Sequence, residues 1–121
     1  MTLRHALAAS ALASLALLAT TTQAQTPPPL KIGVMLPFTG TYAALGVAIE
    51  NGFKLYVAEQ GGTLGGRAIE YVKVDDESDP SKATDNVNKL IKRDNVDVVV
   101  GTVHSGVAAA MARVAKDTGT I

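Results

Sequence analysis

Short apolar runs alternate with longer amphipathic segments along residues 30–121, and this alternation restricts the fold more than any other feature of the sequence. Apolar runs predict strands, and segments with apolar residues every three or four positions predict helices. Strands joined by helices of this length form a parallel sheet with right-handed crossovers. The sequence therefore predicts an α/β fold, a three-layer doubly wound parallel sheet. Its predicted strands and helices alternate in the order 30–36, 46–60, 67–75, 80–93, 96–100 and 106–118.

The first predicted strand indicates where the centre of the sheet lies. Residues 30–36 carry apolar side chains on both faces, as a strand does when helices cover both sides of a parallel sheet. In residues 67–75, Glu70 and Lys73 interrupt the apolar pattern, which places this strand nearer an edge. Residues 96–100 predict a short buried strand.

The predicted helices have recognisable ends and apolar stripes. The pair Gly61–Gly62 ends the first helix, and Asp79 with Pro80 begins the second as N-cap and first helical residue. Residues 63–66 predict a turn. Stripes spaced by three and four residues should face the sheet, and their members are Ile49, Phe53, Tyr56, Val57, Ala83, Val87, Leu90, Ile91, Val107, Ala110, Met111, Val114 and Ala115.

The beginning of the chain has the three parts of an export signal. A basic start, an apolar run and a small-residue exit predict a signal peptide over residues 1–24, cleaved after Ala24. A retained membrane anchor is the alternative, but the apolar run at 6–19 is shorter than the about 20 residues that cross a bilayer. Residues 25–29 include three consecutive prolines and predict an extended leader before the domain at 30–121.

The composition excludes several classes of partner. After removal of Arg4 with the signal peptide, 10 Lys and Arg face 11 Asp and Glu, a formal charge of −1. No basic patch suggests nucleic acid or anionic lipid. The sequence has no cysteine, so it has neither a disulfide nor the lipid-bearing cysteine of a bacterial lipoprotein. We expect an exported protein without a membrane anchor.

Three loops follow the predicted strands, and ligands of doubly wound sheets bind at these carboxyl ends. The loop at 101–106 is the strongest candidate, because it leads into a helix N-terminus whose free amides attract anions. Ser105 adds a hydroxyl, and Gly106 lets a ligand approach the backbone closely. Spacing favours a plainer role, in which the Ser105 hydroxyl caps the helix by accepting a bond from the amide of residue 107 or 108. Both roles stay open.

The other polar loop residues suggest little chemistry. His104 is most simply an inert loop residue, because His5 leaves with the signal peptide and no cysteine could complete a zinc site. The acidic residues at 75–79 are expected to be solvated loop carboxylates, with Asp79 as an N-cap, and not a magnesium or phosphoacceptor pocket. The sequence has no nucleophile elbow, Walker motif or dinucleotide-binding glycine motif. We expect no catalytic activity, no metal and no cofactor.

An ordered set of short motifs covers nearly all of residues 30–121. They are LKIGV at 30–34, PFTG at 37–40, IENG at 49–52, glycine pairs at 61–62 and 65–66, Asp75–Asp76, Asp79–Pro80 and Gly101. This set resembles the leucine/isoleucine/valine-type periplasmic binding proteins of ABC transporters, which are type I solute-binding proteins. The resemblance implies that the chain is the first part of lobe 1 of a two-lobed fold. Such proteins close on a small carboxylate-bearing ligand and deliver it to a permease in the inner membrane.

The resemblance also implies which residues bind the ligand. In the family, a serine four residues after the glycine that ends the third strand binds the ligand carboxylate, and here this serine is Ser105. The loop after the first strand also lines family sites, often with an aromatic residue before the glycine that opens the helix. That position is Leu45 here, with Tyr42 nearby. The candidate ligand-binding residues are Ser105, Gly106, Thr102, His104, Leu45 and Tyr42.

The implied function is that of the periplasmic solute-binding component of an importer for branched-chain or related amino acids. Because Leu45 replaces an aromatic residue, an aromatic or other small organic acid is an alternative ligand. A ligand-sensing ectodomain is a further alternative. Residues 25–121 form an incomplete lobe in this interpretation, and we expect that segment alone to be unstable or to aggregate, and not to bind ligand.

Overall fold

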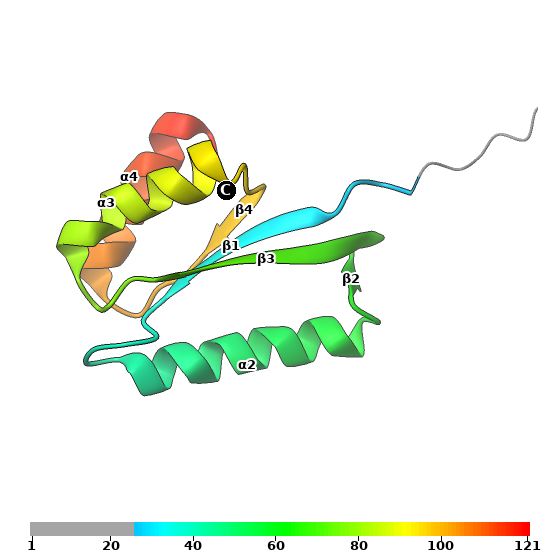
Figure 1. Cartoon of the computed structure of the whole chain (residues 1–121), viewed down its shortest axis with the longest axis horizontal. Helices are drawn as coiled ribbons and strands as arrows, with labels where there is room; N and C mark the ends of the chain where they lie inside the picture. Colours follow the sequence, from blue (N-terminus) through cyan, green and yellow to red (C-terminus); the bar gives the residue numbers. More distant parts are fainter. Residues whose placement is uncertain (1–25) are drawn as a thin grey trace, which may run out of the picture.

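The structure is a computed structural model that describes residues 26–121, and these form a sheet with helices on both faces (Figure 1). Strand order is β2-β3-β1-β4, in which β1 pairs in parallel with β3 and β4 and β2 pairs antiparallel with β3. The predicted α/β class and mainly parallel sheet are confirmed. The elements are β1 (Leu30–Leu36), α2 (Ala43–Glu59), β2 (Thr63–Leu64), β3 (Arg67–Asp75), α3 (Pro80–Asn88), the π-helical turn η1 (Lys89–Arg93), β4 (Val98–Val100) and α4 (Ser105–Thr118).

The central strand β1 divides the core into two layers. Ile32, Val34 and Leu36 belong to a cluster that includes Phe53 of α2, whereas Met35 belongs to a cluster with residues of α3 and α4. Successive side chains of a strand point to opposite faces, so α2 covers one face of the sheet and α3 with α4 covers the other (Figure 1). The three-layer arrangement is confirmed.

Helix α2 differs from the prediction in its start and in its buried face. It begins at Ala43, three residues before the predicted start at 46. Val57 is buried, but Ile49 and Tyr56 are 43% and 53% exposed, so half of the predicted stripe is wrong. The reason is Gly46, which lies so close to β1 that an added Cβ would be 1.9 Å from the carbonyl oxygen of Pro37. The helix therefore contacts the sheet along a face that includes a glycine, which an apolar periodicity does not detect.

Two predictions about the short segments are also wrong. Residues 63–66 are not only a turn, because Thr63–Leu64 forms β2 against the start of β3, and Gly65–Gly66 makes the reversal with positive φ angles of 56° and 75°. Strand β4 is shorter than residues 96–100, and its three valines are half-buried. The amide of Val96 donates instead to the carbonyl of Leu90, 3.2 Å away, beside η1, so this residue does not join the strand ladder.

The last two helices follow the prediction closely. Asp79 caps α3 and its carboxylate accepts a hydrogen bond of 2.8 Å from the amide of Ser81. Gly119 ends α4 with a φ of 71°, as a glycine at a helix C-terminus does. The prediction of their core is confirmed for the buried residues Ala83, Val87, Leu90, Val107, Ala110, Met111 and Val114. The signal peptide predicted for residues 1–24 lies outside the described residues.

Candidate functional site

The carboxyl ends of β1, β3 and β4 lie at one edge of the sheet, because the three strands are parallel. The loops that leave them lead into α2, α3 and α4 and gather at the end of the sheet drawn at lower left in Figure 1. Their contact is close. A Cβ on Gly40, which has a φ of 79°, would lie 2.6 Å from the carbonyl oxygen of Glu77, and a Cβ on Gly106 would lie 2.9 Å from the Pro80 ring. Glycine at these two positions therefore allows the three loops to meet.

Asp75, the last residue of β3, holds the loop that follows β1. Its carboxylate accepts hydrogen bonds from the amides of Phe38 at 2.8 Å and Thr39 at 3.3 Å, and from the Thr39 hydroxyl at 2.6 Å. The amide of Glu77 donates a further bond of 2.8 Å. Burial raises the pKa of Asp75, but these hydrogen bonds outweigh burial and hold it below its ordinary value.

Asp76 extends the same network to the loop that follows β4. Its side chain is fully buried, accepts a hydrogen bond of 2.8 Å from the amide of Ser78, and accepts another from the hydroxyl of Thr102. The hydroxyl of Ser78 in turn accepts a bond of 3.3 Å from the amide of Tyr42. The prediction that the acidic residues are solvated loop carboxylates is therefore wrong for Asp75 and Asp76. The sequence signal for this network is the pair of adjacent carboxylates, Asp75 and Asp76, at the end of a predicted strand.

The N-terminus of α4 is capped by His104 and not by Ser105. The backbone of His104 is extended, with φ −81° and ψ 122°, and its Nδ1 accepts a hydrogen bond of 3.0 Å from the amide of Gly106. The neutral imidazole then carries its proton on Nε2. His104 is therefore not an inert loop residue. The capping role considered for Ser105 is wrong, because Ser105 is already the first residue of the helix and the extended residue before it, His104, is the N-cap.

Ser105 is the first residue of α4, and its side chain is exposed. Within residues 26–121 its hydroxyl has no hydrogen-bond partner, and no protein acceptor faces the amides of Ser105 and Val107. These groups are the unpaired donors that every helix has in its first turn. A hydroxyl, two amides and the positive end of a 14-residue helix can together bind one carboxylate.

The structure brings together some of the predicted site residues and separates others. The rings of Tyr42 and His104, from two different loops, have centroids 6.1 Å apart and planes inclined at 57°, and Ser105 and Gly106 adjoin His104 in the chain. The hydroxyl of Thr102 donates a hydrogen bond to the carboxylate of Asp76. Leu45 lies inside α2, not in the preceding loop, and is 52% exposed.

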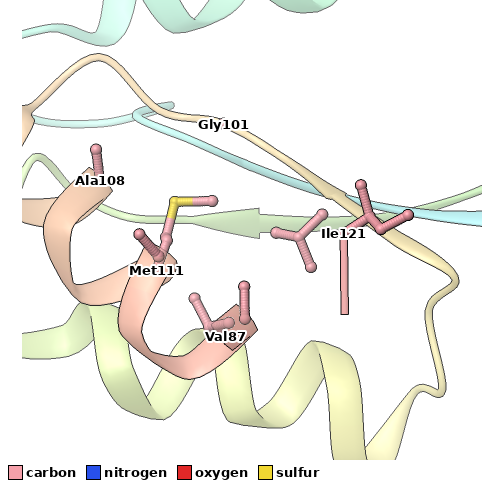
Figure 2. Close-up of a pocket in the computed structure, with 8 residues that line it drawn as sticks. Val87, Gly101, Ala108, Met111 and Ile121 are labelled. Carbon is pink, nitrogen blue, oxygen red and sulfur yellow. The ribbon is translucent and has the colours of Figure 1, made fainter. Parts of the chain in front are cut away.

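A separate apolar cavity of about 220 Å³ lies beside β4 and α4 (Figure 2). The amide of Val99 donates a hydrogen bond of 2.8 Å to the carbonyl of Ile121 at this edge of the sheet. No charged side chain lines the cavity, so it does not suit a carboxylate. Its lining residues are Val87, Val99, Gly101, Ala108, Met111, Ala112, Ala115 and Ile121.

Residues 26–121 contain neither a cluster of potential metal ligands nor a helix suited to span a membrane. In this segment no three His, Asp or Glu side chains gather as a metal site would require. None of the helices described there combines the length and the apolar character needed to cross a bilayer.

Known proteins are similar to this chain in sequence and in fold. A family model described as periplasmic binding protein matches residues 29–121. The Leu/Ile/Val-binding protein BraC3 of Rhizobium johnstonii is 35% identical over 95 residues, which cover 76% of this chain and 25% of that protein. The chain thus spans about a quarter of the length of this relative.

Solved structures give the same result. An ABC-transporter solute-binding protein from R. palustris, in complex with benzoate, is 58% identical with a TM-score of 0.74, covering 75% of this chain and 25% of that one. A solute-binding protein from Rhodopseudomonas palustris BisB5, in complex with 3,4-dihydroxybenzoic acid, is 32% identical with a TM-score of 0.71, covering 77% of this chain and 25% of that one. LivJ from Streptococcus pneumoniae, in complex with isoleucine, is 33% identical with a TM-score of 0.70, covering 76% of this chain and 27% of that one.

The matched family model covers all of the sheet and its helices, and the matched structures are solute-binding proteins of ABC transporters. The predicted resemblance is confirmed: this chain belongs to the periplasmic binding protein family and contains the N-terminal part of its fold.

Proposed function

We propose that the protein is the periplasmic solute-binding component of an ABC importer, and that it binds a small carboxylate where the loops after β1, β3 and β4 meet. The observation that carries this proposal is the first turn of α4, where the Ser105 hydroxyl and two amides lack protein partners. The ligand carboxylate would accept hydrogen bonds from these donors. Gly106, Tyr42, His104 and Leu45 would line the remainder of this half of the site, and an inner-membrane permease would receive the solute.

An aromatic carboxylate is the ligand class that we favour. The relative with 58% identity was solved with benzoate, and Tyr42 and His104 place two rings 6.1 Å apart beside the helix N-terminus. A ligand ring could pack against either of them, because pairs of aromatic rings are favourable at centroid separations of about 4.5–7 Å.

Branched-chain amino acids are the second candidate. The name of the Rhizobium johnstonii relative and the isoleucine-bound LivJ structure favour them. The structure with 3,4-dihydroxybenzoic acid is 32% identical to this chain, and the structure with isoleucine is 33% identical. Overall sequence identity at this level therefore does not separate the two ligand classes. The Leu45 position, which carries an exposed aliphatic side chain, is compatible with either ligand.

Thermal shift and calorimetry on the full-length protein test both parts of the proposal. Benzoate, 3,4-dihydroxybenzoate, leucine, isoleucine and valine would be compared, and a ligand at 100 times its Kd should stabilise the folded state by about 2.7 kcal/mol. Ser105→Ala should weaken binding by about tenfold or more, because a hydrogen bond to a charged group is lost. Ser81→Ala, in the first turn of α3, is the matched control. Wild-type affinity in Ser105→Ala would contradict the assignment.

We also propose that residues 1–24 are a cleaved signal peptide. Cell fractionation with N-terminal sequencing of the mature protein should find it in the periplasm, beginning at Gln25. A cytoplasmic protein that retains residues 1–24 would contradict this proposal.

A further inference from the structure

A series of part-buried hydrogen bonds links the loops that carry the proposed site. It starts at Asp76, which is fully buried at the end of β3. In the sheet order β2-β3-β1-β4, β3 and β4 are not neighbours, because β1 lies between them. The Asp76 carboxylate nevertheless accepts a hydrogen bond from the hydroxyl of Thr102 in the loop after β4. This one side chain therefore reaches past the end of the central strand.

On its other side, Asp76 is connected by hydrogen bonds to the loop after β1. The other carboxylate oxygen of Asp76 accepts a bond of 2.8 Å from the amide of Ser78. The hydroxyl of Ser78 then accepts a bond of 3.3 Å from the amide of Tyr42. Hydrogen bonds from Tyr42 to Ser78, from Ser78 to Asp76 and from Thr102 to Asp76 thus connect all three loops without a ligand.

Burial of Asp76 favours the bond between Asp76 and Thr102 in the folded state. A carboxylate that has left water must be matched by donors, since an unmatched buried charge is far more costly than a lost surface contact. The bond also occupies the hydroxyl proton of Thr102, so this proton is not available to a ligand. Thr102 stands two residues before His104, the N-cap of α4, and fixing one therefore restricts the other.

We propose that Asp76 and Thr102 are positioning residues, which hold the N-terminus of α4 against the other two loops in the arrangement that binds the solute. This inference rests on the proposed function and assigns Thr102 a role different from ligand contact. If a fraction of molecules loses this arrangement, the apparent Kd rises in inverse proportion to the fraction that remains competent. The association rate should fall by the same factor, while the dissociation rate of the bound complex stays nearly constant.

Thr102→Val in the full-length protein is the decisive variant, because it removes the hydroxyl and keeps the side-chain volume. Binding of benzoate and of isoleucine would be measured by calorimetry and stopped flow at 25 °C, well below the Tm of each variant. For whichever ligand the wild type binds, we expect a Kd at least about fivefold higher, carried by a slower association rate. Thr102→Ser should restore both values. Thr118→Val, which removes a hydroxyl bonded to the Val114 carbonyl at the far end of α4, should leave them unchanged.

The outcomes separate this inference from the function on which it depends. A Thr102→Val protein with a lower Tm but wild-type Kd and association rate would overturn the positioning role and leave the proposed function intact. A wild-type protein that binds neither ligand class would overturn both. If Thr102→Val does not fold, Ser78→Ala decides, since it breaks the same series of hydrogen bonds at a half-buried hydroxyl. Weaker binding in Ser78→Ala supports the inference, and wild-type binding overturns it.

Discussion

Two glycines of helix α2 should respond in opposite ways to the same substitution. Gly46→Ala should destabilise the protein, whereas Gly52→Ala should stabilise it. Both residues lie inside the helix at Ala43–Glu59, so both gain the same intrinsic helix propensity, about 1 kcal/mol. The difference between them therefore isolates the contact between α2 and the sheet.

The magnitude follows from the space around each glycine. A Cβ on Gly46 would lie 1.9 Å from the Pro37 carbonyl oxygen, where real Cβ contacts are essentially never under 3.0 Å, so the helix must move by at least about 1.1 Å. Pro37 follows the buried end of β1 and is itself fully buried, which leaves little room for relaxation. Overpacking of this kind costs about 1–3 kcal/mol and occasionally more. Nothing lies within 4 Å of a Cβ on Gly52, so we expect a gain there of about 0.5–1 kcal/mol.

Urea unfolding of the full-length protein, followed by circular dichroism, would measure both effects. We expect the free energy of unfolding to fall by about 1–3 kcal/mol in Gly46→Ala and to rise in Gly52→Ala, with unchanged m-values. Ligand affinity should also fall in Gly46→Ala, because the shifted helix carries Leu45 and adjoins Tyr42. If the two variants have equal unfolding free energies, the close packing of α2 on β1 is refuted.

Substitutions at three further residues test the network and the caps. Burial raises the pKa of Asp75, but hydrogen bonds from Thr39, Phe38 and Glu77 lower it by more, so the pKa is lower in the folded state than in the unfolded state. The ionised carboxylate therefore stabilises the folded state. This stabilisation is complete above the unfolded pKa of about 4 and is lost as the pH falls through the lower folded pKa. In Asp75→Asn, the dependence of the urea midpoint on pH between about 2 and 5 should therefore flatten, and an unchanged slope would refute this. His104→Ala should cost about 1 kcal/mol of unfolding free energy and His104→Asn much less; equal losses would exclude a capping role. Asp79→Ala should cost about as much, with Asp79→Ser recovering most of it.

Part of the candidate site could be predicted from sequence. The loop at 101–106 was identified because a glycine-bounded segment between a strand and a helix has a defined geometry, and α4 begins there at Ser105. The sequence does not decide which residue caps α4, because both a serine and a histidine can accept a hydrogen bond from a backbone amide of the first turn, and only the backbone angles of His104 identify it as the N-cap. The bond between Asp76 and Thr102 spans 26 residues, and no local pattern predicts such a pairing.

The sequence by itself determined the order of elements other than β2, the ends of β1 and β3, the cap at Asp79, the glycine termini of α2 and α4 and the buried stripes of α3 and α4. These features depend on neighbouring residues and on periodicity, which a linear pattern contains. Only the tertiary structure decided which face of α2 meets the sheet, that Asp75 and Asp76 are hydrogen-bonded and not solvated, and that the rings of Tyr42 and His104 lie 6.1 Å apart. Each of these depends on how closely two distant backbones approach, and that distance is set by glycines and by buried polar groups that an apolar pattern does not register.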